Sequence, residues 1–317
     1  MSDEKNSPIL VSGSVAYDRI MDFPGYFRDH FIPEKMHAIS VSFNVETVAD
    51  NFGGTAANIA YNLALLDLPP KIISTAGSDF ERYRGHLKAN HIDPTSIAVD
   101  PKALTAAAFV ITDKGDNQIS AFAIGAGKAP YLPLPETERV RCAIIGAGCI
   151  RDMQSLPEHY RSHKIPFMYD PGQAIPKLSA VDLREGLRGA SVLFANDYEF
   201  GLIAIKTGWD IPQLLDNTPA IVITYAEKGS RVVTKEVEYK VNAVAVSEVA
   251  DPTGAGDAYR AGFIAGFLKK LSLETCAKIG STLAAYVVEK YGTQTHHFTL
   301  PELGERYKTA YGEDLPI

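Results

Sequence analysis

Short apolar segments alternate with longer stretches of helical periodicity along most of this 317-residue chain. Strands are expected at residues 9–16, 71–76, 141–145, 166–170, 192–195 and 221–225, and a further β-rich segment at 237–249. Helices are expected at residues 56–66, 80–90, 155–162, 198–206, 258–268, 273–290 and 301–309. This alternation predicts an α/β fold in which helices cover both faces of a mostly parallel sheet.

Two segments interrupt the alternation. Residues 18–51 mix turn and strand character, and residues 104–124 read as a hairpin about Lys114, Gly115 and Asp116. Both excursions are expected to leave the same edge of the sheet, so that residues 18–51 and 104–125 form a small β lid. Because neither a repeat nor a linker divides the remainder, residues 1–317 are expected to form one domain.

The stretch Asp251-Pro-Thr-Gly-Ala-Gly-Asp257 opens a helical pattern. Three small residues, Gly254, Ala255 and Gly256, leave their backbone N–H groups uncovered at a helix N-terminus. This arrangement favours the binding of an anion. A carboxylate at Asp257 would repel that anion, so we expect it to have a chemical task that offsets the repulsion. We predict that Asp257 is a general base for a hydroxyl group that attacks a bound phosphoryl group. The alternative is a plain helix cap, which usually needs one acidic residue rather than two.

Two motifs resemble the signatures of the ribokinase (PfkB) family of sugar and nucleoside kinases. One covers residues 251–262, and the other is the paired-glycine stretch Asn51-Phe-Gly-Gly-Thr-Ala-Ala-Asn58. The chain also resembles the bacterial adenosine kinases of this family, at residues 23–27, 33–34, 40–43, 196–199, 260 and 292–294. The resemblance runs from residue 9 to about residue 312 and implies a three-layer α/β/α ribokinase-like fold with a β lid.

The same resemblance implies an enzyme that phosphorylates the 5′-hydroxyl group of adenosine. Asp18, which follows the first strand, would accept hydrogen bonds from two ribose hydroxyl groups. The alternative for Asp18 is a solvated loop residue. Further contacts to the nucleoside are implied for Ser14, Ser42, Gly53, Gly54 and Asn58.

Recognition of adenine needs a flat apolar surface and a group that both donates and accepts hydrogen bonds. Phe122 and Gln173 are expected to supply them, although Phe122 would alternatively belong to the lid core and Gln173 to the surface. The adenosine kinases that the chain resembles carry a second Gln where Ala174 stands and another aromatic residue near Ala108. These departures leave open a kinase for another nucleoside, or for a furanose sugar such as ribose or fructose.

The expected phosphate donor is ATP with Mg²⁺. The resemblance implies phosphate contacts from Asn196, Thr224, Gly229, Thr253, Gly254 and Gly256. It also implies Mg²⁺ at Glu199 through water, and a monovalent cation such as K⁺ at Asp251. Asn196 would equally serve as a helix N-cap. Position 226, usually Gly in this family, is Ala here.

Composition narrows the remaining classes. A net charge of −7 argues against nucleic-acid binding. The polar N-terminus does not resemble a signal peptide and no apolar stretch suits a bilayer, so a cytoplasmic protein without membrane contact is expected. The cysteines Cys142, Cys149 and Cys276 lack metal-ligand spacing. The adjacent His296 and His297 are expected in an exposed loop.

Other function classes fit the sequence less well. Gly127-Lys128 lacks the upstream glycine of a phosphate-binding P-loop, and Arg151 stands where a dinucleotide fingerprint after Gly146 needs glycine. A non-catalytic nucleoside-binding protein would not need Asp257. Unpaired edges of the lid strands would allow two copies of the chain to form a homodimer.

Overall fold

The computed structural model describes residues 7–32, 37–38, 40–115 and 117–317. Its centre is an eight-stranded sheet with the order β14-β13-β12-β11-β10-β9-β1-β4. The strands are β1 (Ile9–Ser12), β4 (Pro70–Ile73), β9 (Cys142–Ile145), β10 (Phe167–Tyr169), β11 (Val192–Asn196), β12 (Ile221–Thr224), β13 (Ser230–Val233) and β14 (Glu238–Val241). From β4 to β12 all neighbours are parallel, and β13 and β14 add antiparallel at one edge. The predicted mostly parallel sheet is confirmed.

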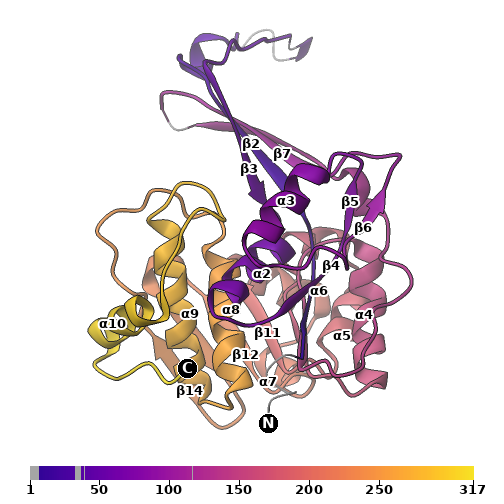
Figure 1. Cartoon of the computed structure of the whole chain (residues 1–317), viewed down its shortest axis with the longest axis vertical. Coiled ribbons are helices and arrows are strands. Elements are labelled where there is room, and N and C mark those ends of the chain that lie inside the picture. Colours follow the sequence, from indigo (N-terminus) through magenta and orange to yellow (C-terminus); the bar gives the residue numbers. More distant parts are fainter. Residues whose placement is uncertain (1–6, 33–36, 39, 116) are drawn as a thin grey trace.

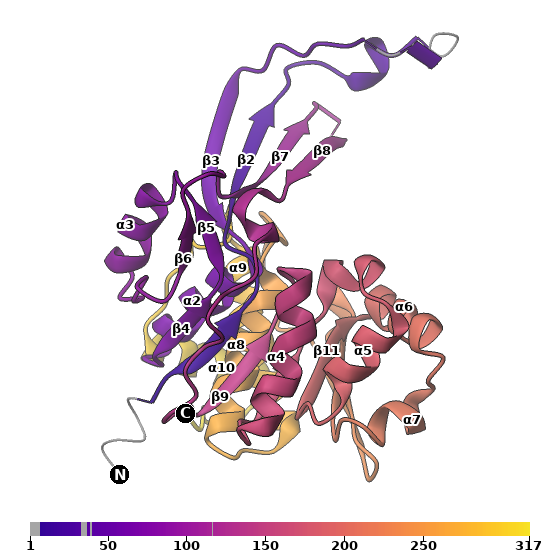
Figure 2. The same ribbon diagram turned by 90° about the vertical axis from the view of Figure 1, so that its right-hand side faces the viewer.

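Helices cover both faces of this sheet (Figure 1; Figure 2). They are α2 (Thr55–Leu65), α3 (Glu81–Ala89), α4 (Ile150–Ser162), α5 (Ala180–Leu187), α6 (Asp197–Thr207), α7 (Ile211–Leu215), α8 (Ala255–Leu268), α9 (Leu273–Val288) and α10 (Leu300–Tyr311). Short 3-10 turns lie at η1 (Phe27–Asp29), η3 (Gly125–Lys128), η4 (Gly172–Lys177) and η5 (Ala226–Lys228). Among the described residues, none of the helices combines the length and apolar character that a bilayer crossing requires.

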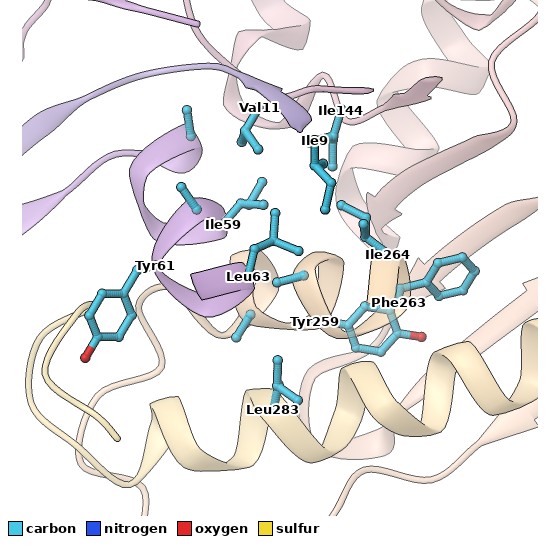
Figure 3. Close-up of a cluster of buried hydrophobic side chains, with 14 of the residues drawn as sticks. Ile9, Val11, Ile59, Tyr61, Leu63, Ile144, Tyr259, Phe263, Ile264 and Leu283 are labelled. Atoms are coloured by element: carbon cyan, nitrogen blue, oxygen red, sulfur yellow. The ribbon is translucent and has the colours of Figure 1, made fainter. Parts of the chain in front are cut away.

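Two hydrophobic cores result, because successive side chains of a strand point to opposite faces of the sheet. Ile9 and Val11 of β1 face the core formed with α2, α8 and α9, where Ile59, Leu63 and Ile264 converge (Figure 3). Leu10 faces the other core, formed with α4, α5 and α6. The central sheet is thus the middle layer of three.

A second sheet occupies the two segments expected to form the lid. Its order is β3-β2-β7-β8, and it projects from one end of the molecule (Figure 1). The strands are β2 (Ala16–Asp22), β3 (Thr47–Gly53), β7 (Ala106–Thr112) and β8 (Gln118–Ala123). We call it the lid sheet. A small parallel pair, β5 (Thr75–Gly77) and β6 (Ala98–Asp100), lies at its base (Figure 2).

The two halves of the lid sheet are tied together at the far end. Asp113 accepts a hydrogen bond of 2.9 Å from the N–H of Phe27. The N–H of Lys114 donates to Gly25 O at 2.9 Å. The N–H of Phe23 also donates to Thr112 O at 2.8 Å. These contacts hold the hairpin against the segment that follows β2.

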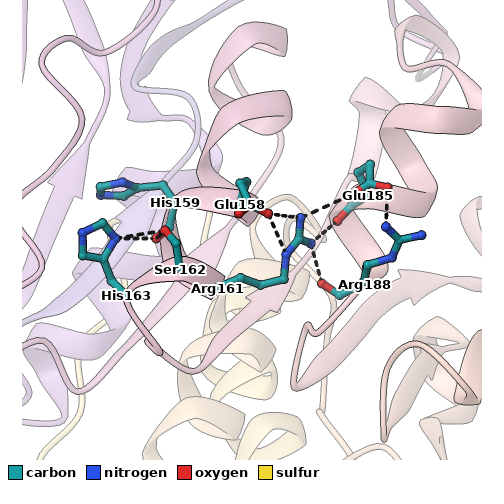
Figure 4. A network of polar contacts seen from close by, with 7 residues as sticks. All are labelled: Glu158, His159, Arg161, Ser162, His163, Glu185 and Arg188. Carbon is teal, nitrogen blue, oxygen red and sulfur yellow. Dashed lines mark hydrogen bonds and ion pairs between the residues drawn. The ribbon is translucent and has the colours of Figure 1, made fainter.

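On the outer surface, Arg161 connects α4 to α5 (Figure 4). Its Nη1 donates to the backbone oxygens of Glu185 at 2.8 Å and Arg188 at 2.7 Å. Its Nη2 bonds the Glu158 carboxylate at 2.7 Å. The guanidinium therefore satisfies carbonyl groups at the C-terminal end of α5.

Several predicted boundaries were wrong. The first strand ends at Ser12 because the chain turns at Gly13 and re-enters an extended conformation as β2 in the lid sheet. The segment 71–76 divides between β4 and β5, and only Glu238–Val241 of the β-rich segment 237–249 is a strand. Helix α4 begins five residues before the expected 155 and contains Pro157. Helices α5 and α7, each opened by a capping box, had not been predicted.

Candidate active site

The N-terminus of α8 lies at the base of a cleft of about 800 Å³. Gly254 is the N-cap residue, with a φ of +82°, and no side chain caps the first turn. A Cβ at Gly254 would lie 3.1 Å from the Thr293 side chain, so both space and backbone conformation require glycine there. The N–H of Ala255 reaches back to Pro252 O at 3.2 Å. Gly254 and Gly256 are therefore better placed than Ala255 to donate to an anion in the cleft.

The carboxylate of Asp257 is half-buried in the first turn of α8. It accepts a hydrogen bond of 2.8 Å from Asn58 Nδ2. Burial raises the pKa of Asp257 to about 7, the Asn58 hydrogen bond and the Arg260 charge lower it, and the charges of Asp170 and Asp18 raise it further. A carboxyl group with this pKa gains and loses a proton near neutral pH, as a general base requires.

Arg260, one turn after Asp257, forms a buried ion pair that the sequence had not identified. Its Nε donates to Asp170 Oδ2 at 2.9 Å, with both side chains at most 7% exposed. Its Nη1 donates to Gly256 O at 3.1 Å. Because Gly256 belongs to the expected anion site, Arg260 would help to hold that backbone in place. The signal in the sequence was an Arg three positions after the acidic residue and an Asp at a strand end.

The residues expected to hold the sugar meet at the base of the lid sheet, where β2 begins and β3 ends. Burial, and secondarily the charge of Asp251, raises the pKa of Asp18 to about 6. The Asp18 carboxylate lies so close to Gly53 that a Cβ there would overlap it. Gly54 has a φ of +96°, and Ser14 Oγ accepts a hydrogen bond of 3.0 Å from the N–H of Thr55. The structure thus brings Ser14, Asp18, Gly53 and Gly54 together at the start of α2.

Strand register places Phe122 in a row with Asp18. Ala108 is paired with Asp18 on one side and with Phe122 on the other, and Asn51 is paired with Asp18 across β3. Residues directly opposite one another point to the same face of a sheet. Phe122 is 53% exposed, so it does not belong to a lid core, and the small side chain of Ala108 leaves room between it and Asp18.

Not every expected contact residue joins this group. Ser42 is exposed and lies beyond the far ends of β2 and β3. Gln173 lines the 800 Å³ cleft together with Asn196 and Glu199. Phe122 is not among the residues that line this cleft, so Gln173 and Phe122 do not share it.

Asn196 and Glu199 form a capping box at the start of α6. The N–H of Glu199 donates to Asn196 Oδ1, and the N–H of Asn196 donates to Glu199 Oε2, both at 2.8 Å. The N-cap role of Asn196 is therefore confirmed. Burial, followed by the negative charge of Asp170, raises the pKa of Glu199. The Asp170 carboxylate is already paired with Arg260, so Glu199, with Oε1 outside the capping box, is the carboxylate that could serve a divalent cation.

Of the other expected residues, Thr224 and Gly229 line the cleft, whereas Asp251 and Thr253 lie outside its lining. Thr224 ends β12, and Gly229, with a φ of +88°, ends the turn that follows. Ala226, at the position expected to prefer glycine, has a φ of +50°. Asp251 accepts hydrogen bonds from the N–H groups of Thr253 at 2.9 Å and Gly292 at 3.1 Å. Thr253 itself is exposed at the mouth of this loop.

The expectation that His296 lies in an exposed loop was wrong. Its side chain is 1% exposed, and its Nε2 contacts Asn62 Oδ1 at 2.9 Å. Tyr61 donates to its carbonyl oxygen at 2.6 Å. The neighbouring His297 is exposed, as expected. The burial of His296 arises from α2, which is more than 200 residues away in sequence.

A family model described as pfkB family carbohydrate kinase matches residues 14–299. The nucleoside kinase of Methanothermobacter thermautotrophicus is 33% identical, with 100% of both chains covered. The nucleoside kinase of Burkholderia thailandensis in complex with inosine has a TM-score of 0.84 at 32% identity, covering 96% of this chain and 99% of the other. The Methanocaldococcus jannaschii nucleoside kinase, an archaeal member of the ribokinase family, has a TM-score of 0.86 at 29% identity, covering 96% of this chain and 99% of the other. The chain therefore belongs to the pfkB family of carbohydrate kinases, with a ribokinase-like fold, and is a phosphotransferase that acts on a hydroxyl group.

Proposed function

We propose that this kinase transfers the γ-phosphoryl group of ATP to the 5′-hydroxyl group of a nucleoside. The main observation behind this proposal is the position of the Asp257 carboxylate. This carboxylate lines the cleft with Gly254 and Gly256, and it is hydrogen-bonded to Asn58, four residues after Gly54. It therefore stands between the anion site and the residues expected to hold the sugar.

In the proposed reaction, Asp257 takes the proton of the 5′-hydroxyl group as its oxygen attacks the γ-phosphorus. The new P–O bond forms as the bond from phosphorus to the β,γ-bridging oxygen breaks, and ADP leaves with that electron pair. The N–H groups of Gly254 and Gly256 stabilise the charge on the transferred oxygens. Closure of the lid sheet would exclude water that otherwise hydrolyses ATP.

For the acceptor, Asp18 and the paired glycines would hold the ribose, while Phe122 offers a ring on the same face of the lid sheet. Adenosine is the acceptor that the sequence predicts. The inosine complex of the similar Burkholderia thailandensis enzyme supports a second candidate, another purine nucleoside. The space beside Ala108 is consistent with either base. A furanose sugar would leave Phe122 unused.

For the donor, the proposed phosphate contacts are Asn196, Thr224, Gly229, Thr253, Gly254 and Gly256. The Glu199 carboxylate would hold Mg²⁺ through water, since only its Oε2 is engaged in the capping box. When bound, Mg²⁺ neutralises phosphate charge. Asp251 would hold K⁺ through lone pairs that its two backbone donors leave free.

Pairing of two copies through the lid sheet also remains a prediction. The edge strands of this sheet are β3 and β8. All six residues of β8 are exposed, so this edge is accessible to a second strand. Size-exclusion chromatography with light scattering would show whether the chain forms a dimer.

The test of the proposed function is ADP release from Mg-ATP with adenosine, inosine, guanosine, cytidine, ribose and fructose offered separately. Turnover with one or more nucleosides at micromolar concentration would support the proposal, and the preferred base would name the acceptor. Preference for ribose or fructose would show that the nucleoside assignment is wrong. Binding of ATP without turnover of any acceptor would favour a non-catalytic role.

A further inference from the structure

Gln294 lies at the centre of a buried hydrogen-bond network that ends at Asp257. Its side chain is 5% exposed and uses all of its hydrogen-bonding capacity except one acceptor lone pair. Nε2 donates to Asn58 Oδ1 and to Tyr83 Oη, both at 2.8 Å. Oε1 is 2.9 Å from His86 Nε2. Asn58 then donates to Asp257 at 2.8 Å.

The direction of each hydrogen bond follows from the chemistry of these groups. Gln294 Oε1 can only accept, so His86 Nε2 must carry a hydrogen and donate to it. Burial lowers the pKa of His86, which keeps the ring neutral, with Nδ1 left to accept from Asn90 Nδ2 at 3.4 Å. Gln294 Nε2 can only donate, so the Asn58 atom that faces it must be Oδ1. The remaining Asn58 group, Nδ2, must then face Asp257.

We propose that Gln294 is a positioning residue for the catalytic carboxylate, because it fixes the Asn58 amide with its N–H donor directed at Asp257. The two ends of an amide have nearly the same shape, so packing alone does not select between them. The opposite orientation would direct Asn58 Oδ1 at the ionised Asp257 carboxylate, which is repulsive. Gln294 removes that alternative.

A second branch of the network reaches the sugar side of the site. Tyr83 Oη accepts from Gln294 and donates to Gly53 O at 2.6 Å. Gly53 packs directly against the Asp18 carboxylate. One amide therefore fixes both the base and the glycine beside the proposed ribose contact. The contact between Gln294 and Asn58 spans 236 positions of sequence.

This inference rests on the proposed role of Asp257 as general base. Since an amide N–H stabilises the ionised carboxylate, the loss of Gln294 should raise the pKa of Asp257. The other charged groups that act on Asp257 are Arg260, Asp170 and Asp18, and none of them contacts Gln294. A change in the pH profile would therefore report on the Asn58 amide rather than on those charges.

The test compares full-length Gln294→Met with the parent chain in ATP-dependent turnover of its best nucleoside. Met keeps the length of the side chain and removes its hydrogen bonds. We expect kcat to fall about tenfold and the acid limb of kcat/KM to move up by about one pH unit, with the KM for ATP unchanged. In an Asn58→Ala background, Gln294→Met should not move the acid limb any further.

His296→Phe is the matched control, because it removes one buried donor from the same segment to the same helix, α2. It should lower Tm without moving the acid limb. His86→Phe is a milder second variant, since it keeps the ring stacked on Phe52 and frees Gln294 Oε1. It should shift the acid limb in the same direction as Gln294→Met, but by less. If Gln294→Met does not fold, His86→Phe still tests the proposal.

The outcomes separate the two proposals. If Gln294→Met and His296→Phe lower kcat and Tm equally, and neither moves the acid limb of kcat/KM, then Gln294 has only a structural role. If Asp257→Asn abolishes turnover while Gln294→Met and His86→Phe leave the limb unmoved, this inference alone is overturned. If Asp257→Asn retains near-normal turnover, the base assignment and the inference fail together.

Discussion

Asn58 and Asp257 are joined by a 2.8 Å hydrogen bond although 199 positions separate them in the sequence. Asn58 belongs to α2, which starts at the paired glycines, and Asp257 belongs to α8, which starts at the proposed anion site. The two helices also pack against each other in the core that both share. The proposed acceptor and phosphate sites are therefore built on one rigid pair of helices.

The first prediction concerns Asp257→Asn. An amide cannot take the hydroxyl proton, so kcat should fall about 10²- to 10⁴-fold. Asn is isosteric, and the Asp18 side of the site is untouched, so the Kd for nucleoside should stay within about threefold. Single-turnover kinetics and calorimetric titration would measure the two quantities. A variant with nearly full kcat would exclude Asp257 as the base.

The second prediction is a loss of activity on the acid side. Asp257 must be ionised to accept a proton, and burial raises its pKa to about 7. Below that pH kcat/KM should fall about tenfold per unit, and protonation of Asp18 near pH 6 should steepen the fall. Asp152→Asn is the control, because burial also raises the pKa of Asp152 to about 6, but this residue lies in α4 and bonds Tyr131. An acid limb that moves in Asp152→Asn would contradict the assignment.

The third prediction concerns the space at Gly53. In Gly53→Ala the new methyl group would overlap the Asp18 carboxylate and displace it. The KM for nucleoside should rise at least about tenfold, whereas the KM for ATP should not change. Gly201→Ala provides the control, since a Cβ there meets nothing within 4 Å and a helix gains stability from alanine. An equal KM for nucleoside in Gly53→Ala and Gly201→Ala would argue against a steric role for Gly53.

The fourth prediction separates the two roles of Glu199. Gln at this position keeps the capping box, because its carbonyl oxygen can accept from the N–H of Asn196. It removes the charge proposed to attract Mg²⁺. The Mg²⁺ concentration for half-maximal activity should therefore rise, about tenfold, while Tm stays close to that of the parent chain. Glu302→Gln, in the capping box of α10, should leave the Mg²⁺ requirement unchanged.

The fifth prediction concerns the buried pair of Arg260 and Asp170. Arg260→Met leaves the Asp170 carboxylate buried without its partner, which should lower the free energy of unfolding by about 3–5 kcal/mol. The pair of Arg231 and Glu238, whose side chains are 32% and 35% exposed, supplies the comparison. Arg231→Met should lower the free energy of unfolding by less than about 1 kcal/mol. Urea titrations at neutral pH would measure both. Similar losses would mean that the burial of Arg260 is unimportant.

The parts of the fold that sequence predicts well are those with local signals. Strands β9 to β12 are short apolar runs bounded by turns, and α8 follows a glycine turn with an acidic first turn. Capping residues also signal helices α5 and α7 locally, through Ser179 and Asp210. Those helices are short, so their apolar periodicity is weak and the caps had to be noticed first.

The parts that sequence could not supply depend on contacts between distant segments. The row of Asp18, Ala108 and Phe122 is set by strand register, which no spacing along the chain encodes. Gln294 resembles a short family motif, but its partners on α2 and α3 emerge only when the chain folds. The same reason explains why the burial of His296 was missed.

Strand β8 shows how this enzyme can diversify. Its residues Gln118–Ala123 are all exposed, yet Phe122 stands in line with Asp18. Replacements at exposed positions usually change the free energy of unfolding by no more than about 0.5 kcal/mol. The proposed base, by contrast, is supported by the buried side chains of Asn58, Tyr83 and Gln294. Selection for a different acceptor can therefore act on residues 118–123 while the chemistry and the fold are inherited unchanged.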